Sequence, residues 1–389
     1  MKKSKILGSV VLASVIATGA SADVKLFGHL GALYTHGLGD QKSDKGNSVG
    51  AAGLTGHLGV DIGFGGAGFG VGAWGGSQLW GAQVAGRGYG EYMYGTDYID
   101  LSDLYFRYNS MFDFYVGRFD GNFLKADWID NYIQGIGFSY KLGTESNIWA
   151  TWANDYTTFG VMPGRIASEL QNYRRFPSSF NGFGVGDRDM FGIGLNYHTG
   201  LFDVDPFLHY WLSAPGWYND NVLQAGVKGA LKLGNGGFKS ISTARFMWQN
   251  ATNSNTYLVW LDQEFRLANI FKVGAGWYMT GDGGIARMTD HARFYGRYTI
   301  PQGGGYFGNN QNTWYVFGGA DHGRFKLDVL YAGGDYQEFS AVGSVRVFDA
   351  SLAIMRDGLG LDVGAGYVNN GFSNSFRQDA LIAFAKLIF

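Results

Sequence analysis

The 389-residue chain contains no cysteine, so disulfide bonds cannot hold its fold together. After about residue 20 it also lacks any apolar run close to the roughly 18–20 residues that a membrane-spanning helix requires. These two absences exclude a disulfide-built secreted domain and a protein anchored by membrane helices. The fold must therefore be held together by another closed network of contacts.

An excess of positive charge is missing as well. The chain has 30 Lys and Arg residues against 32 Asp and Glu residues. Three of the lysines, Lys2, Lys3 and Lys5, lie in the first 22 residues, which contain no acid, so residues 23–389 carry 27 basic and 32 acidic side chains. This mild negative balance argues against nucleic acid as a partner.

The first 22 residues, "MKKSKILGSVVLASVIATGASA", have the layout of a secretory signal peptide. A basic start is followed by an apolar stretch from Ile6 to about Gly19 and then by Ala20-Ser21-Ala22. An ordinary N-terminal helix is the alternative interpretation. We expect residues 1–22 to be removed after export, leaving a single domain over residues 23–389.

Glycine and aromatic residues are abundant, with 64 glycines and 17% aromatic residues. Low-complexity disordered chains are poor in aromatics, so this composition excludes them. Segments such as "LGLDVGAGYV" (359–368) and "LQAGVKGALKL" (223–233) alternate apolar with small or polar residues, which predicts β-strands. Strands of about nine to eleven residues suit a tilted membrane crossing better than a soluble sandwich, whose strands are usually shorter.

The connections between these strands alternate between short and long. The short, turn-forming ones are "NS" (109–110), "GNGG" (234–237), "DHG" (321–323) and "RDG" (356–358). The long ones are 35–50, 81–101, 119–134, 154–187 and 281–311. Short turns at one rim and long loops at the other are typical of an outer-membrane β-barrel.

We therefore predict an all-β protein, a transmembrane antiparallel β-barrel of about 18 strands with short periplasmic turns and long extracellular loops; 16 strands is the alternative. Residues 338–355 are compatible with one strand or two, and the single strand 345–355 gives the even count of bacterial single-chain barrels. The predicted strands are 24–34, 51–62, 68–80, 102–109, 112–118, 135–141, 146–153, 188–197, 202–211, 222–233, 238–248, 256–266, 270–280, 313–320, 324–331, 345–355, 359–369 and 380–389.

The last residues, "DALIAFAKLIF", are predicted to form the strand that closes the barrel against "VKLFGHLGALY" (24–34). An open edge in lipid would leave backbone groups unsatisfied, at several kcal/mol each. Alternate residues from Leu381 to Phe389 would face lipid, and Lys386 would point inward. Two interfacial girdles are predicted from tyrosines near strand ends: Tyr34, Tyr331 and Tyr367 at the loop rim, and Tyr108, Tyr140 and Tyr197 at the turn rim.

These features resemble bacterial outer-membrane proteins, whose assembly machinery recognises a final strand ending in an aromatic residue such as Phe389. More narrowly, "YVGRFDGNFLKADWIDNYIQGIGFSY" (115–140) and the spread of strands resemble the Helicobacter–Campylobacter (Hof-type) family of outer-membrane proteins. That family is similar in architecture to the eighteen-stranded OprD-like channels. The resemblance implies location in the outer membrane and contact with its lipid, its lipopolysaccharide and the barrel-assembly machinery.

Charged and small residues occupy the predicted inward positions. The inward charges are Lys25, Arg107, Lys141, Lys228, Lys232, Arg245, Lys272, Lys326 and Arg346, with Asp61, Asp203, Asp205, Asp328 and Asp362. Such a lining suits a water-filled channel, whereas an eight-stranded barrel fills its interior with side chains. The simplest interpretation is that most of these charges keep the lumen hydrated.

Loops 154–187 and 281–311 are long enough to be functional. The first contains Arg165, Arg174 and Arg175, and the second contains Arg287, Arg293 and Arg297. Folded inward, as constriction loops are in OprD-like channels, these arginines would form a positive eyelet for carboxylates or phosphates. Folded outward, they would bind lipopolysaccharide phosphates or be solvated. The shorter loop 119–134, with Asp127 and Asp130, would supply an acidic face opposite.

Enzyme motifs are weak or missing. "GFGGAG" (63–68) fits a dinucleotide-binding fingerprint, but no crossover helix follows, so we interpret it as a turn between the second and third strands. The P-loop, zinc-protease and nucleophile-elbow motifs do not occur. The seven histidines are scattered, which favours solvated lumen residues over catalytic or metal sites. A hydrolase site assembled in space remains a minor alternative.

The sequence thus predicts a porin, a passive diffusion channel for small polar solutes with a preference for anionic or zwitterionic nutrients. We expect no enzymatic activity, no cofactor and no metal, and we leave self-association of the barrels open. The alternative from another class is a surface adhesin, a barrel that displays its long loops.

Overall fold

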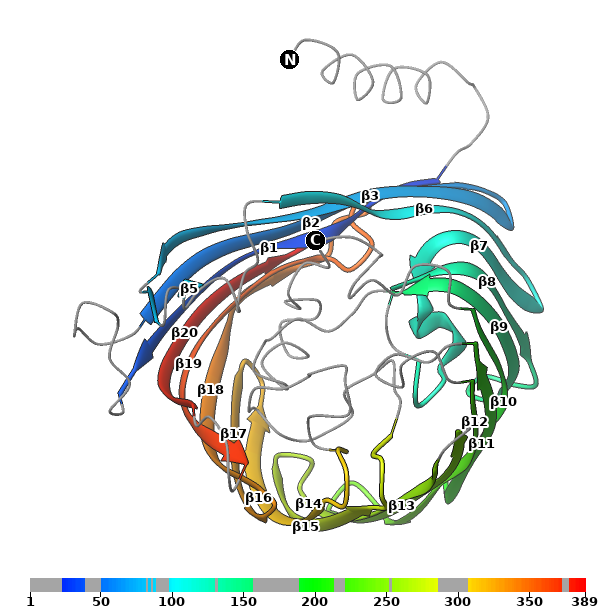
Figure 1. Ribbon diagram of the computed structural model, residues 1–389. Coiled ribbons are helices and arrows are strands. Elements are labelled where there is room, and N and C mark those ends of the chain that lie inside the picture. The colour runs from blue at the N-terminus through cyan, green and yellow to red at the C-terminus, as the bar shows by residue number, and fades with distance from the viewer. Residues whose placement is uncertain are drawn as a thin grey trace.

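The computed structural model describes residues 23–38, 50–81, 83–84, 87–88, 98–129, 132–156, 189–212, 221–251, 254–285, 307–372 and 378–389. Eighteen of its strands form one antiparallel sheet that closes into a barrel (Figure 1), as predicted. These strands are β1 (Asp23–Gly37), β2 (Gly50–Phe64), β3 (Ala67–Gly81), β6 (Tyr98–Asn109), β7 (Phe112–Asp120), β8 (Tyr132–Lys141), β9 (Asn147–Tyr156), β10 (Met190–His198), β11 (Phe202–Trp211), β12 (Val222–Gly234), β13 (Phe238–Ala251), β14 (Ser254–Leu267), β15 (Phe271–Thr280), β16 (Asn312–His322), β17 (Phe325–Gly334), β18 (Tyr336–Ala350), β19 (Leu359–Phe372) and β20 (Gln378–Ile388). The two-residue strands β4 (Gln83–Val84) and β5 (Arg87–Gly88) pair separately.

The barrel closes where the sequence predicts, because β20 pairs with β1. The ladder runs from Gly37 opposite Ala380 to His29 opposite Ile388. Beyond it, the amide of Gly28 donates to the Phe389 oxygen at 2.8 Å, and the Phe389 amide donates back to Gly28 at 3.1 Å. The chain therefore ends within the hydrogen-bonded wall, and the mark of the C-terminus lies beside β1 (Figure 1).

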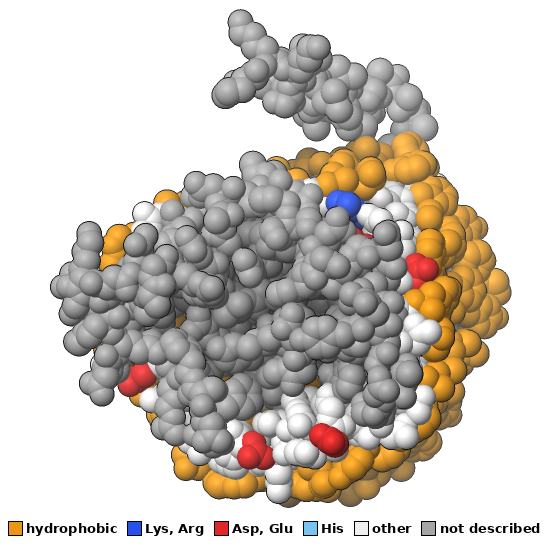
Figure 2. All heavy atoms as spheres, viewed as in Figure 1, with side chains coloured by type: hydrophobic (Ala, Val, Ile, Leu, Met, Phe, Trp, Pro, Cys, Tyr) orange, Lys and Arg blue, Asp and Glu red, His pale blue; other side chains and the backbone are white. Residues whose placement is uncertain are grey.

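Side chains alternate between the two faces of the wall. In β11, Val204 and Leu208 are exposed on the outside, whereas Asp205 and His209 are buried on the inside. Figure 2 shows hydrophobic side chains around the outside of the ring of strands. An apolar surface of this extent marks contact with membrane, because soluble monomers expose far smaller apolar patches.

Tyrosines lie near both ends of the apolar exterior, as predicted. Tyr34 and Tyr331 are exposed near the loop rim, and Tyr108, Tyr140 and Tyr197 are exposed near the turn rim. Such rings suit the interface between lipid and water. Among the residues that the structure describes, no helix is long and apolar enough to cross a membrane.

The turn at "GFGGAG" confirms the interpretation of that motif. β2 ends at Phe64 and β3 begins at Ala67, so only two residues reverse the chain. Gly65 has a φ of +64°, which favours glycine because a side chain there would be strained. The motif therefore forms a hairpin turn. It is followed by strand β3 and not by a helix whose N-terminus could bind a phosphate.

The structure corrects the strands predicted over residues 332–355. The sequence placed a strand over 345–355, whereas β18 occupies Tyr336–Ala350 and follows β17 after the single residue Asp335. The tight reversal is formed by Gly334, whose φ is +112°, and by Asp335, whose carboxylate accepts the Asn312 amide at 2.7 Å. The sequence ended the preceding strand at Tyr331 and left 332–344 as a connection, whereas β17 continues to Gly334 and only Asp335 separates it from β18.

Residues 351–358 form a turn that covers part of the barrel seam. β1 extends below the end of β20, and this turn pairs with the edge left there: the Leu26 amide donates to Ile354 and the Arg356 amide donates to Leu26, both at 2.7 Å. The Arg356 guanidinium also lies 4.2 Å from the ring centre of Phe27. The turn thus satisfies an edge that would otherwise be open.

Candidate functional site

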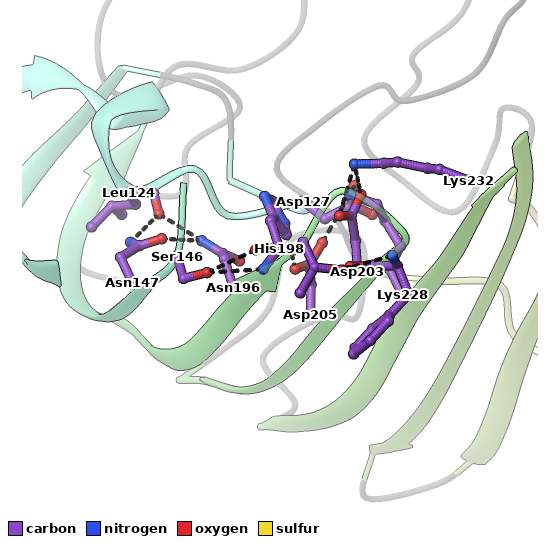
Figure 3. A network of polar contacts seen from close by, with 12 residues as sticks. Leu124, Asp127, Ser146, Asn147, Asn196, His198, Asp203, Asp205, Lys228 and Lys232 are labelled. Atoms are coloured by element: carbon purple, nitrogen blue, oxygen red, sulfur yellow. Dashed lines mark hydrogen bonds and ion pairs between the residues drawn. The ribbon is translucent and has the colours of Figure 1, made fainter. Parts of the chain in front are cut away.

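The loop after β7 lies inside the barrel, against the inner faces of several strands (Figure 3). It begins with the short 3-10 helix η1 (Gly121–Leu124), which Asp120 caps by accepting the Asn122 amide at 3.0 Å. The carbonyl of buried Leu124 accepts hydrogen bonds from Asn147 of β9 at 3.0 Å and Asn196 of β10 at 3.1 Å. We call residues 121–129 the inner loop.

Asp127, near the end of the inner loop, fixes the loop to strands β12 and β13 of the wall. Its carboxylate accepts from Arg245 Nε of β13 at 2.7 Å and lies 3.0 Å from Lys228 Nζ of β12. Lys228 and Arg245 are directly opposite each other in the β12–β13 ladder. Two like charges in that arrangement repel, so the Asp127 carboxylate supplies a counter-charge that both cations share.

Further ion pairs continue along the wall (Figure 3). Lys228 Nζ also lies 2.9 Å from Asp205 of β11, and the other oxygen of that carboxylate lies 2.7 Å from His198 Nε2. Lys232 Nζ lies 2.7 Å from Asp203. The inner wall therefore places the acidic side chains of β11 beside the basic side chains of β12 and β13.

Aromatic side chains join the inner loop to both ends of loop 281–311. The Trp128 ring lies 6.0 Å from the ring of Phe307, which lies 5.5 Å from Trp260 and 5.2 Å from Tyr278 on the inner wall. Ile285 donates its amide to Phe307 at 2.9 Å and is buried. Residues 281–285 and 307–311 thus start and finish their loop inside the lumen, next to the inner loop.

The other predicted lining cations also meet carboxylates on the inner wall. Arg107 donates two hydrogen bonds to Asp61, at 2.8 and 2.5 Å, although β3 lies between their strands. Lys272 of β15 pairs with Asp328 of β17 across Gly319 of β16. In both cases a glycine on the middle strand leaves space for the long side chain that crosses it. A Cβ at Gly319, for example, would lie 2.7 Å from Lys272 Cε.

The structure thus places four predicted site residues, Arg107, Lys228, Arg245 and Lys272, on the inner wall, and brings two of them to Asp127. Asp127 is in direct contact with Lys228 and Arg245, and the loop arginines that its acidic face was predicted to oppose lie outside the described residues. The remaining predicted site residues lie outside the described residues: Arg165, Arg174, Arg175, Arg287, Arg293, Arg297 and Asp130.

The sequence analysis missed the residues that hold the inner loop in place, chiefly Asn147 and Asn196. Their amide groups are linked at 2.8 Å and are almost fully buried. An inward amide in an otherwise apolar strand was an available signal. The pairing of Lys228 with Arg245 could be expected only approximately, because Lys228 lies seven residues before the short turn at 235–237 and Arg245 lies eight residues after it.

One histidine–carboxylate pair of the inner wall, His57 with Asp103, is not arranged to activate its neighbouring serine. His57 Nε2 lies 2.6 Å from Asp103 Oδ2, but Ser102 Oγ donates to that same carboxylate oxygen at 2.5 Å and not to the imidazole. The histidine therefore cannot take the serine proton in this arrangement. Within the described ranges, no cluster of three or more His, Asp or Glu residues is placed to hold a metal ion.

Comparison with known proteins shows the class of fold. No family model matches the chain, and no curated protein matches its sequence. Solved structures do match over nearly the full length of both chains. OccK5 (OpdH) of Pseudomonas aeruginosa has 12% identity and a TM-score of 0.62, covering 94% of this chain and 97% of its own. OccAB2 of Acinetobacter baumannii has 12% identity and a TM-score of 0.63, covering 96% and 99%.

A third similar structure is the outer membrane protein opdK from Pseudomonas aeruginosa, with 11% identity and a TM-score of 0.61 over 94% of this chain and 99% of its own. The chain therefore has the fold of OprD-like eighteen-stranded barrels, a class of transmembrane β-barrel. At these identities the likeness concerns the fold.

Proposed function

We propose that this protein is an outer-membrane porin, a passive diffusion channel for small polar solutes. Its apolar exterior suits lipid, and an eighteen-stranded barrel is too wide for wall side chains alone to fill. The observation that carries the proposal is the inner wall, where Asp127 of the inner loop meets Lys228 and Arg245. A lumen narrowed by a folded-in loop and lined with charged pairs selects hydrophilic solutes by size and charge.

The fold-level likeness to Occ channels supports this proposal and favours a channel over an enzyme. Location in the outer membrane follows from the same argument, with export directed by residues 1–22 and assembly by the strand ending at Phe389. The stretch 115–140 supports membership of the Helicobacter–Campylobacter (Hof-type) family. Contact with lipopolysaccharide and with the barrel-assembly machinery belongs to this proposal.

Planar-bilayer recordings test the proposal directly. A porin reconstituted from detergent gives discrete, ohmic conductance steps in potassium chloride. A barrel that only displays adhesive loops and is plugged inside gives none. Absence of conductance from protein that retains its β-sheet spectrum and resists unfolding in unheated detergent would exclude the porin function.

We further propose that the channel prefers anionic or zwitterionic solutes through arginines of loops 154–187 and 281–311. The support is chemical: Arg pairs with carboxylates in bidentate fashion, and the two loops contain six arginines against five acidic residues; the arginines are Arg165, Arg174, Arg175, Arg287, Arg293 and Arg297. The double variant Arg174→Glu and Arg293→Glu should weaken anion preference in reversal-potential measurements across a salt gradient. Cation preference in the unmodified channel would remove this part of the proposal.

A further inference from the structure

A groove of about 740 Å³ lies on the outer surface of strands β11 to β15, the green to yellow part of the ring in Figure 1. Two rows of outward side chains border it, and within each row the residues are directly opposite one another in successive ladders. The row nearer the short turns is Phe202, Leu231, Ser242, Gln263 and Ala275, and the next row is Val204, Gly229, Ala244, Leu261 and Trp277. We call this feature the outer groove.

The outer groove exists because small residues occupy its middle. Gly229 and Ala244 are directly opposite each other, and Ser242 lies on the same face two residues before Ala244. A Cβ at Gly229 would have no atom within 4 Å, so the space above this residue is open. The exposed side chains of Phe202 and Leu261 stand on the two sides of this space.

No charged side chain points into the outer groove from the described strands. Asp203 and Asp262 border it, but their side chains lie on the inner face of the wall. There, Asp203 pairs with Lys232 at 2.7 Å. Asp262 accepts a hydrogen bond from Tyr315 at 2.6 Å. The backbone of the sheet therefore forms part of the floor, and an occupant of the groove meets no ion.

A small polar network lies at the side of the groove that is nearer the short turns. Ser242 Oγ donates to Gln263 Oε1 at 2.5 Å. Gln263 Nε2 donates to Ser240 Oγ at 3.0 Å and to the Glu264 carbonyl at 3.2 Å. Because polar groups that face hydrocarbon are costly unless they are bonded, this internal pairing keeps the groove suited to an apolar occupant. A hydroxyl that accepts a hydrogen bond still has one hydrogen to donate, so Ser240 can offer its hydrogen to an oxygen atom beside the groove.

The occupant must come from the membrane, because the groove is continuous with the apolar surface that surrounds the barrel. It crosses five strands, a distance of about 19 Å at a strand spacing of about 4.8 Å. A long, narrow and apolar acyl chain fits such a space. A second copy of the barrel fits less well, because a twofold dimer presents the same patch on both sides. Two grooves would then face each other and leave their volume unfilled.

We propose that the outer groove binds one acyl chain of a phospholipid from the periplasmic leaflet, with the ester group of the lipid at Ser240. The leaflet follows from the position of the groove near the short turns: Phe202 is the first residue of β11, and Leu231 lies three residues before the end of β12. Because the groove is assembled from five strands, the lipid binds only the folded wall and therefore stabilises it. This inference goes beyond the porin function, since the groove lies outside the lumen.

Native mass spectrometry of the full chain, folded in detergent and titrated with palmitoyl-oleoyl phosphatidylethanolamine, tests the proposal. The unmodified protein should retain one lipid. Gly229→Leu fills the open space and should weaken retention at least tenfold. Gly343→Leu is the matched control and should keep the lipid, because Gly343 is an outward glycine of β18 at which a Cβ makes only ordinary contacts, at 3.7 and 4.0 Å.

Ala275→Leu narrows the groove at its β15 end and provides a second variant, should Gly229→Leu fold poorly. It should also weaken retention at least tenfold. Retention of the lipid by either folded variant at the level of the unmodified protein would overturn the site.

Two other outcomes would overturn the choice of occupant. Lipopolysaccharide retained in preference to phosphatidylethanolamine would contradict the periplasmic leaflet. A dimer of barrels that Gly229→Leu abolishes, with the lipid adduct unchanged, would mean that the groove holds another barrel. Conductance does not enter this test: a lipid retained by a barrel that never conducts supports the groove and removes the channel, and conductance without a retained lipid does the reverse.

Discussion

Replacing Asp127 by asparagine is the sharpest perturbation of the proposed constriction. The side chain keeps its size, but the site loses the one carboxylate that bridges Lys228 and Arg245. These cations are directly opposite each other; Lys228 has a second carboxylate, Asp205, at 2.9 Å, and the Asp262 carboxylate also acts on Arg245. The variant therefore makes the net charge beside the inner loop more positive by one unit.

The size of the effect can be estimated from Coulomb's law. A unit charge changes the energy of an ion at ~4 Å by about 1 kcal/mol in water. Screening at physiological salt reduces this to about 0.5 kcal/mol for each permeating ion. Cations are disfavoured and anions favoured by that amount, which separates them by about 1 kcal/mol, or about fivefold in the permeability ratio. Stability should fall by about 2 kcal/mol, because the three side chains are only partly hydrated.

Reversal potentials across a potassium chloride gradient measure this ratio. Asp127→Asn should shift it about fivefold towards chloride. Asp321→Asn, which removes an exposed carboxylate at the turn end of β16, is the matched control and should shift it little. Adding Arg245→Gln to Asp127→Asn should restore the original ratio, since the net charge returns.

The reasoning fails if folded Asp127→Asn protein keeps the unmodified reversal potential, or if the Asp321 control shifts it equally. Either result would mean that permeating ions do not pass near the inner loop.

Three further changes test the fold that positions this site. Gly28→Ala should lower the unfolding free energy by at least ~2 kcal/mol in urea titrations. The reason is that Gly28 has a φ of +141° and that a Cβ there would lie 2.0 Å from the His57 backbone oxygen. Gly143→Ala, which places its Cβ in open space, is the control and should leave the unfolding free energy unchanged. Deleting Phe389 removes both of its hydrogen bonds to Gly28 and should reduce the folded fraction on unheated detergent gels; an unchanged fraction would contradict its role in closure. Asn196→Leu removes the hydrogen bonds to Leu124 and Asn147, so it should lower the unfolding free energy by about 1–3 kcal/mol and increase the fluctuations of the single-channel current. A variant with unchanged stability and unchanged current fluctuations would show that this anchor of the inner loop is dispensable.

Most of the barrel could be predicted from sequence because its signal is local. Outward residues such as Val204 and Leu208 must be apolar and inward residues such as Asp205 need not be, so alternation marks each strand. The signal fails after Tyr331, because Gly333-Gly334-Asp335 is typical of a longer connection although only Asp335 separates the two strands. Strand ends there depend on the Gly334 backbone and the Asn312–Asp335 hydrogen bond, neither of which a period-two pattern reports.

The candidate site was only half predictable. Alternation correctly placed Arg107, Lys228, Arg245 and Lys272 on the inner wall, because the side of the sheet to which a side chain points is set within its own strand. Their partners depend on long-range geometry: Asp127 and Arg245 are 118 residues apart in the sequence. Loop length was also a poor guide to that contact, because the inner loop is far shorter than the loops expected to narrow the lumen.

The pairing of charges explains some of the glycines on the inner wall. Asp61 and Arg107 are separated by β3, yet they bond because Gly68 and Gly70 leave its inner face bare; a Cβ at Gly68 would lie 2.9 Å from Arg107 Cζ. Lys272 reaches across Gly319 in the same way. Each glycine thus lets a long side chain lie flat along the wall instead of projecting into the lumen. Charges held flat along the wall keep the path open and hydrated, so the inner loop and not the wall side chains narrows the lumen here.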